Sequence, residues 1–205
     1  MIDDLVRQSV RAYSNSAEGY ARVSGSYDSF PGLAEAIDDF ERRTPPGIIL
    51  DAGCGAGRDS RFLIERGRRV IALDLSEALL KTWPVHLMPT NVSRVMGDLA
   101  VPPIRNRTCA GVWACASLLH QRAEAIPSVV SGLADLLCRG GLIAVSLRGR
   151  GSSGWHRSDV VRARRWQTVL TPDELTSLLR DRGLHSVEWR WTGGDWYMAW
   201  GNVPV

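Results

Sequence analysis

The stretch IILDAGCGAGR at 48–58 constrains the fold more than any other part of this sequence. A short apolar run ends in the carboxylate of Asp51, and three glycines follow within five residues. An apolar run of this length predicts a buried strand, and a glycine-rich turn after such a strand is where an α/β sheet brings its backbone close to a ligand. A tight turn between a strand and a helix would also use these glycines, so the stretch alone leaves the function open.

Apolar runs that end in a carboxylate recur along the chain. VIALD at 70–74 has this form, and Asp98 closes a third run at 93–98. Two more apolar runs, at 111–116 and 142–147, predict a fourth and a fifth strand. Because parallel strands end at one edge of a sheet, we expect the three carboxylates to lie close together.

Segments with helical spacing precede the first run and also lie between and after the others. The part between the first two expected helices, 2–12 and 31–43, carries three tyrosines and is expected to be a polar link. Ser76 is placed as the N-cap of a short helix that follows the second strand. The other helices are expected at 2–12, 31–43, 57–66, 123–138 and 171–183.

The C-terminal part, 184–203, alternates as expected for two antiparallel strands joined at Gly193 and Gly194. Strands that alternate with helices predict a parallel sheet covered on both faces. The terminal hairpin adds an antiparallel edge, so the sheet is expected to be mixed.

The composition is that of one globular domain. The chain has 205 residues, 44% hydrophobic and 23% charged, and a net charge of only +3, which argues against nucleic acid as a partner. It has no apolar stretch of membrane-spanning length, and acids near its start oppose a secretory signal, so we expect a cytoplasmic protein. No CxxC pair is present, so free thiols and no metal site are expected for Cys54, Cys109, Cys115 and Cys138.

The carboxylates narrow the ligand class. Asp74 lies 17 residues after Gly57, at the end of the second strand, where a carboxylate can accept hydrogen bonds from both hydroxyls of a ribose. Asp51 beside the glycines would repel a pyrophosphate, and the glycine spacing differs from the dinucleotide pattern GxGxxG. A nucleoside that carries positive charge, S-adenosylmethionine (SAM), therefore suits the site better than NAD.

Several motifs together resemble the class I SAM-dependent methyltransferases. They cover most of the chain: LDAGCGAG at 50–57, VIALDLS at 70–76, GDL at 97–99, GVWACASLLH at 111–120 and RGGLIAVSL at 139–147. The stretch GRDSRFLIERGRRVIALDLS looks most like the small-molecule branch that includes the tellurite-resistance and thiopurine methyltransferases.

The resemblance implies a Rossmann-like, doubly wound α/β fold. Its seven-stranded mixed sheet would have the order 3-2-1-4-5-7-6, with helices on both faces. Residues 1–46 would form a helical cap or lid, and residues 47–205 the methyltransferase domain, with 148–168 as an arginine-rich insert on the acceptor side. The cofactor would be SAM and the product S-adenosylhomocysteine.

The resemblance also implies the cofactor site. Asp51 with the glycines would hold the methionine part, Asp74 the ribose, and Asp98 with the Leu99 amide the adenine edge. Two tyrosines are candidates for a lid, and ordinary packing of an N-terminal helix explains them equally well. The predicted cofactor-binding residues are Asp51, Gly53, Cys54, Gly55, Gly57, Arg58, Asp74, Leu75, Asp98, Leu99, Cys115, Tyr13 and Tyr20.

The acceptor side is predicted from two features. His120, after the fourth strand, is the candidate catalytic base, although a structural histidine fits that place too. The segment 148–166 carries six arginines and one acid, which suggests a lid that binds an anionic acceptor or, alternatively, a solvated loop. The predicted substrate-binding residues are Ser117, Arg148, Trp155, His156, Arg165 and Trp166.

The sequence therefore predicts a methyltransferase that acts on a small molecule, possibly anionic or aromatic. An RNA or DNA methyltransferase is one alternative, because arginines interleaved with tryptophans can bind phosphates and bases. A SAM-binding protein without transferase activity is the other, because the predicted donor site argues only for binding.

Overall fold

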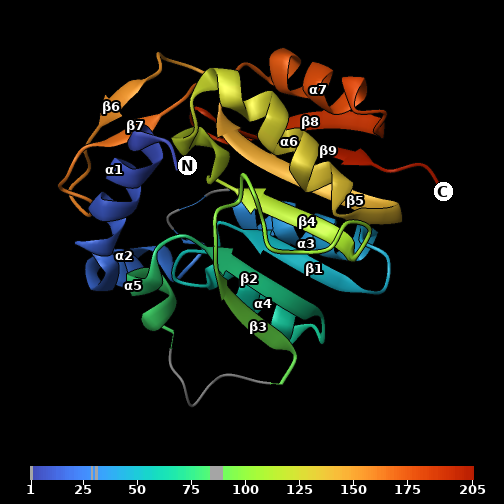
Figure 1. Ribbon diagram of the computed structural model, residues 1–205, viewed down its shortest axis with the longest axis horizontal. Coiled ribbons are helices and arrows are strands. Elements are labelled where there is room, and N and C mark those ends of the chain that lie inside the picture. The colour runs from blue at the N-terminus through green and yellow to red at the C-terminus, as the bar shows by residue number, and fades with distance from the viewer. Residues whose placement is uncertain (1, 29, 31, 84–89) are drawn as a thin grey trace.

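A computed structural model describes residues 2–28, 30, 32–83 and 90–205 (Figure 1). Its centre is a seven-stranded sheet with the order β3-β2-β1-β4-β5-β9-β8. Counted within this sheet, the order is the predicted one, and the predicted fold class is confirmed. The strands are β1 Ile48–Ala52, β2 Arg69–Asp74, β3 Val92–Met96, β4 Cys109–Cys115, β5 Leu137–Arg148, β8 His185–Gly193 and β9 Trp196–Asn202.

The first five strands are parallel, and β9 runs antiparallel to both of its neighbours, β5 and β8. Two 3₁₀ turns, η2 and η3, follow β4. None of the helices that the described residues form is both long and apolar enough to span a membrane. The helical segments are α1 Asp4–Ser14, α2 Ala17–Ser24, α3 Leu33–Arg43, α4 Arg58–Glu65, α5 Glu77–Lys81, η2 Leu118–His120, η3 Ala123–Ala125, α6 Ile126–Asp135 and α7 Pro172–Asp181.

Helices cover both faces of the sheet, and the alternation of side chains along each strand explains why. On β1, Leu50 packs into the core on the side of α6 and α7, whereas Ile49 packs on the side of α3 and α4. Successive side chains of a strand point to opposite faces, so a strand that is apolar throughout needs a cover on each side. This arrangement leaves the carboxyl ends of the parallel strands open for a site.

The local signals at helix ends are confirmed. Ser76 Oγ accepts a hydrogen bond from the Leu79 N–H (3.3 Å) at the start of α5. Thr171 and Glu174 form a reciprocal capping box at the start of α7. These side chains satisfy backbone donors that a helix end leaves without partners, which is why the sequence marks the positions so clearly.

Three expectations for local structure are wrong. The link expected between the first two helices contains α2, a helix of which only Ala17 and Ser24 are buried, so it lacks an apolar stripe that could be recognised. The helix expected at 123–138 ends at Asp135, because the Thr108 and Cys109 N–H groups both donate to the Leu136 carbonyl (2.9 Å each) and draw the chain into β5.

The insert is the third case. It contains a separate two-stranded antiparallel sheet, β6 Gly154–His156 and β7 Arg165–Gln167, where a loop was expected. Figure 1 places this hairpin beside α1, away from the central sheet. Helices α1 and α2 and the insert therefore form one layer over the carboxyl ends of the parallel strands (Figure 1).

Candidate active site

The turn after β1 requires its glycines. Gly53, Gly55 and Gly57 have φ angles of +85°, +53° and +81°, a left-handed backbone that favours glycine. A Cβ at Gly53 would overlap the Ser117 side chain, and one at Gly57 would overlap the Trp83 ring. The loop therefore packs directly against the exit of β4 and against the segment after α5.

Asp74 ties this loop to the next strand. Its Oδ2 accepts a hydrogen bond from the Gly55 N–H (2.8 Å), and its Oδ1 accepts one from the Ser76 N–H (2.7 Å). Burial raises the pKa of Asp74, and these backbone donors oppose that rise. A carboxylate has about four lone-pair sites, so Asp74 keeps acceptor capacity for a ligand.

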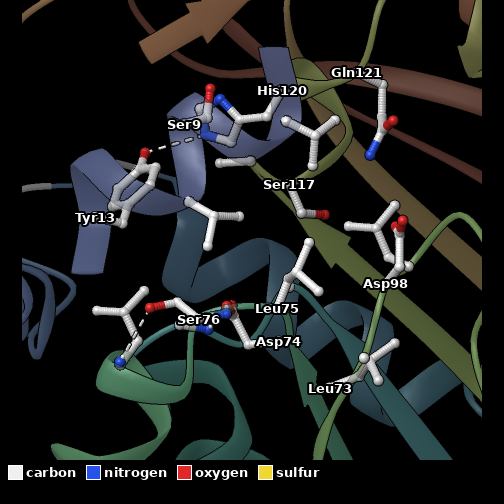
Figure 2. Close-up of a pocket in the computed structure, with 18 of the residues that line it drawn as sticks. Ser9, Tyr13, Leu73, Asp74, Leu75, Ser76, Asp98, Ser117, His120 and Gln121 are labelled. Atoms are coloured by element: carbon white, nitrogen blue, oxygen red, sulfur yellow. Dashed lines mark hydrogen bonds between the residues drawn. The ribbon is translucent and has the colours of Figure 1, made fainter. Parts of the chain in front are cut away.

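A first cavity of about 100 Å³ opens above the ends of β1, β2, β3 and β4. Residues of α1 and η2 form its roof, opposite Asp74 and Ser76 (Figure 2). Other lining residues come from α1 and the ends of β2 and β3. The predicted residues that line it are Tyr13, Tyr20, Gly53, Gly55, Asp74, Leu75, Asp98, Leu99, Cys115, Ser117 and His120.

A second and larger cavity, of about 390 Å³, lies on the other side of the glycine loop. Its further walls come from α2, α3 and the β8–β9 turn. Cys54 and Arg58 line this second cavity only. The two cavities share the residues Tyr20, Gly53, Gly55, Cys115 and Ala116, so they meet across the loop and the end of β4.

Arg58 is rigidly held in the wall of the second cavity. Its Nε and Nη2 donate to the two oxygens of Asp59 (2.7 and 3.0 Å), and its guanidinium lies 4.9 Å from the centre of the Tyr27 ring and 4.6 Å from that of Phe30. Asp59 also accepts from the Tyr27 hydroxyl and the Trp113 Nε1–H (2.8 Å each). Burial alone would raise the pKa of Asp59, but Arg58 and these donors hold it below its usual value.

Asp51 lies beneath the glycine loop and not on the wall of either cavity. It is 2% exposed and accepts a hydrogen bond from Ser60 Oγ (2.6 Å). Burial, and then the charge of Asp59, raise the pKa of Asp51 to about 8. Gly57 is also absent from both walls, because the Trp83 ring packs against it.

His120 joins the roof of the first cavity to the insert. Its Nδ1 lies 2.6 Å from the Trp166 carbonyl oxygen, and its Nε2 lies 3.1 Å from the Tyr13 hydroxyl (Figure 2). A carbonyl can only accept, so the ring carries its proton on Nδ1, and Nε2 accepts from Tyr13. Burial lowers the pKa of His120 to about 4, which keeps the ring neutral near pH 7.

The comparison with known families agrees with this architecture. Residues 49–141, from β1 into β5, match the family described as methyltransferase domain. Over these residues the chain is similar to methyltransferase domains.

A curated relative of this chain is the malonyl-[acyl-carrier protein] O-methyltransferase of Serratia marcescens. It is 30% identical over 141 residues, which are 66% of this chain and 53% of that protein. The chain thus spans about half the length of this relative. A ubiquinone biosynthesis O-methyltransferase of Xylella fastidiosa is 27% identical over 181 residues, 81% of this chain and 72% of that one.

Solved structures share the fold of the whole chain. The complex of DhpI with S-adenosylhomocysteine superposes with a TM-score of 0.79 at 19% identity and covers 100% of this chain and 99% of that one. The Burkholderia thailandensis 1,6-didemethyltoxoflavin-N1-methyltransferase gives a TM-score of 0.71 at 21% identity, with 100% and 92% covered. At these identities the likeness concerns the fold alone.

Most predicted acceptor residues line neither cavity. Arg148 pairs with Asp195 (3.0 Å) and donates to Gln167 (3.0 Å). The Trp155 and Trp166 rings pack edge to face on each other, 5.7 Å apart. Only Ser117 of the predicted set lines a cavity; the others, absent from both walls, are Arg148, Trp155, His156, Arg165 and Trp166.

The sequence revealed the part of the second cavity that the glycine loop, Arg58 and Cys115 form, but it did not reveal the other residues that line this cavity. They come from the segment before α3, the end of β5 and the β8–β9 turn, and they are ordinary apolar or small polar side chains. The glycines at 193 and 194 were the one signal, and they were interpreted only as a turn. The residues that were missed include Phe30, Leu33, Ser146, Thr192 and Trp196.

Proposed function

We propose that this protein binds SAM with its nucleoside in the first cavity and its methionine part at the glycine loop, where the cavities meet, and transfers its methyl group to a small molecule held in the second. One observation carries the proposal: two cavities of different character meet at the glycine loop. Asp74 and Asp98 line the first cavity, whereas the charged side chains among the described residues of the second are the Arg58–Asp59 pair. A donor and an acceptor placed in adjoining cavities can react where the cavities meet. The methionine part of SAM extends toward Gly53, Gly55 and Cys115.

The nucleoside part of SAM is assigned to the first cavity. Asp74 accepts hydrogen bonds from the ribose hydroxyls with the acceptor capacity that the backbone leaves it. Asp98, with the Leu99 amide, reads the adenine edge, and Leu75 packs on its ring. These carboxylates disfavour a pyrophosphate, which supports SAM over a dinucleotide.

Arg58 is assigned to the carboxylate of the methionine part. Among the described residues that line either cavity, it is the only cation, since His120 is neutral. Its Nε–H and one N–H of Nη2 are committed to Asp59, so the two Nη1 hydrogens and the second Nη2 hydrogen can donate to a ligand. A SAM ammonium above the loop would stabilise the ionised form of Asp51 beneath it and lower the pKa of that carboxyl.

The rate of methyl transfer then depends on how the protein positions the acceptor relative to SAM. SAM is an activated donor, and holding a nucleophile in line with its methyl group can contribute about 7–11 kcal/mol. Covering the site with α1 and α2 excludes water, which is the role proposed for residues 1–46 and for Tyr13 and Tyr20. His120 stays a predicted base, but with both ring nitrogens engaged its geometry favours positioning Tyr13.

The second cavity favours an uncharged acceptor. Phe30, Leu33 and Trp196 supply apolar walls, whereas Ser146 and Thr192 supply hydroxyl groups. If SAM occupies Arg58, no further cation among the described residues lines the cavity, which argues against the anionic acceptor expected from the insert. The relationship to the tellurite-resistance and thiopurine branch and the cytoplasmic location stay predictions.

Calorimetry and a transfer assay test the proposal. SAM and S-adenosylhomocysteine are expected to bind, and Arg58→Lys, which keeps a charge beside Asp59 but loses the fork, is expected to weaken binding about tenfold or more. Arg66→Gln, an exposed arginine just after α4, is the control and should bind normally. Binding of a dinucleotide in place of SAM would refute the assignment.

The alternatives separate in the same assays. Thr192→Phe narrows the second cavity and is expected to reduce transfer of labelled methyl groups to small molecules while SAM affinity stays unchanged. A SAM-binding protein without activity would label no acceptor. A nucleic-acid methyltransferase would label RNA or DNA instead, with binding that falls steeply as salt increases.

A further inference from the structure

The last strand of the sheet, β8, presents an open edge. Among the described residues it pairs only with β9, and every second residue turns its backbone N–H and C=O away from that partner. Register shifts interrupt β8 on both sides of Glu188–Trp191, so these four residues form its regular part. All four are exposed, including Trp189 at 39% and Trp191 at 38%.

The side chains of Glu188–Trp191 remain exposed on both faces of this edge. On one face, Trp189 and Trp191 pack edge to face with ring centres 5.5 Å apart, and the Arg150 guanidinium lies 4.1 Å from the centre of the Trp191 ring. On the other face, Glu188 pairs with Arg43 of α3 (2.6 Å), and Arg190 lies over the Trp200 ring (4.9 Å). Tryptophan and arginine are enriched at protein interfaces, whereas open edges are usually protected.

We propose that two copies of this chain associate through β8, antiparallel and about a two-fold axis that passes midway between Trp189 and the Trp189 of the second copy. A two-fold axis normal to a sheet must relate residues that point to the same face. Glu188 and Arg190 share one face and Trp189 has the other, so one residue must lie opposite its own copy, with the axis midway between the two. Within the regular part, the axis can then lie at one of four residues.

Charge selects among these registers. An axis at Glu188 places Glu188 opposite itself, and an axis at Arg190 places Arg190 opposite itself; like charges directly opposite are destabilising. An axis at Trp191 would place Arg190 opposite Thr192, beyond the register shift at the end of the strand. The axis at Trp189 instead forms Glu188–Arg190 pairs on both sides of a tryptophan pair, and each of these contacts is favourable.

The contacts already made by these side chains are compatible with the pairing. The Glu188 side chain remains 59% exposed while it pairs with Arg43, so a second arginine can reach it. The contact is isologous and uses each β8 edge once, so it closes as a dimer and does not propagate. The short regular segment indicates a weak dimer that forms reversibly.

Sedimentation equilibrium of the full chain tests the dimer. Arg190→Glu and Glu188→Arg each convert both cross-strand pairs to like charges and are expected to raise the dimer dissociation constant about tenfold or more. The double variant, Glu188→Arg with Arg190→Glu, restores opposite charges and is expected to return the constant to within about threefold of wild type. Lys81→Glu, a charge reversal on α5 beyond the opposite edge of the sheet, is the control and should dimerise normally (Figure 1).

Circular dichroism and SAM affinity show whether each variant is folded, because neither Glu188 nor Arg190 lines a cavity. Trp189→Lys gives a second route: it places two ammonium groups at the axis and is expected to abolish the dimer. A wild-type chain that remains monomeric up to about 1 mM would overturn the proposal. So would single variants that dimerise normally, or a folded double variant that fails to recover.

Discussion

The two cavities that meet at the glycine loop differ in how the chain builds them. The wall of the first comes mainly from consecutive strand ends and the turns that follow them, such as Gly53, Asp74 and Asp98. The wall of the second combines segments as far apart as Phe30, Ser146 and Trp196. A cavity made of strand ends has its polar groups placed by local backbone geometry, whereas one made of distant segments depends on how those segments pack.

Gly53→Ala should have the largest effect and tests whether the first cavity needs this geometry. The new Cβ meets Ser117 in a left-handed backbone, so we expect a loss of about 3 kcal/mol of stability and the loss of SAM binding. Gly67→Ala is the matched control: its φ is +79° but a Cβ there meets nothing within 4 Å, so only about 1–2 kcal/mol should be lost. Thermal unfolding and calorimetry measure both, and equal effects would contradict the role of the close approach.

The pH dependence of stability tests the contribution of His120, which links the first cavity to the insert. Its folded pKa of about 4 lies below the unfolded value of 6.5, so the unfolded chain binds the proton first as pH falls. The stability contributed by the neutral ring is complete above pH 6.5 and is lost as pH falls toward 4, by about 3 kcal/mol. Denaturant unfolding of His120→Gln should lack this part of the pH dependence; an unchanged profile would contradict the assignment.

Asp74→Ala tests the acid on the nucleoside side. Removing a carboxylate that accepts from the Gly55 and Ser76 N–H groups and from a ribose is expected to weaken SAM binding by about 1.5–3 kcal/mol. Asp181→Ala, an exposed acid at the end of α7, is the control. Calorimetric affinity equal to that of the control would remove Asp74 from the site.

Trp155→Ala should have the smallest effect on SAM. Trp155 packs on Trp166 in the insert and lines neither cavity, so SAM affinity should change by less than about 0.5 kcal/mol. A larger loss in the same titration would show that the insert reaches the nucleoside, and the contrast between the two cavities would then fail.

Much of the first cavity could be predicted because its signals are local. Gly53 follows β1 directly, Asp74 is the last residue of β2, and Leu99 lies in the turn after β3; parallel strands must end at one edge. The role of Asp74 in holding the loop was not predicted, because the hydrogen bond to Gly55 spans 19 residues and depends on the register of β1 and β2. The position of Asp51 beneath the loop likewise depends on the packing of α4.

The arginine-rich insert was predicted to form the acceptor site because its charge is conspicuous in the sequence. In the fold, Arg148 is neutralised by Asp195, which lies 47 residues away, and Arg165 contacts Ser158 and Val161 within the insert itself. The sequence shows a charged side chain but does not reveal whether another side chain of the fold will neutralise it. The side chains that line the second cavity carry no comparable signal.

The sequence by itself determined the seven-stranded fold, the glycine turn and the carboxylates at the strand ends, because periodicity, capping and backbone sterics act over a few residues. Only the tertiary structure decided that Tyr13 and His120 roof one cavity, and that Phe30, Thr192 and Trp196 surround the other. Such contacts join segments distant along the chain, and their formation depends on how helices and strands pack, which no local pattern specifies.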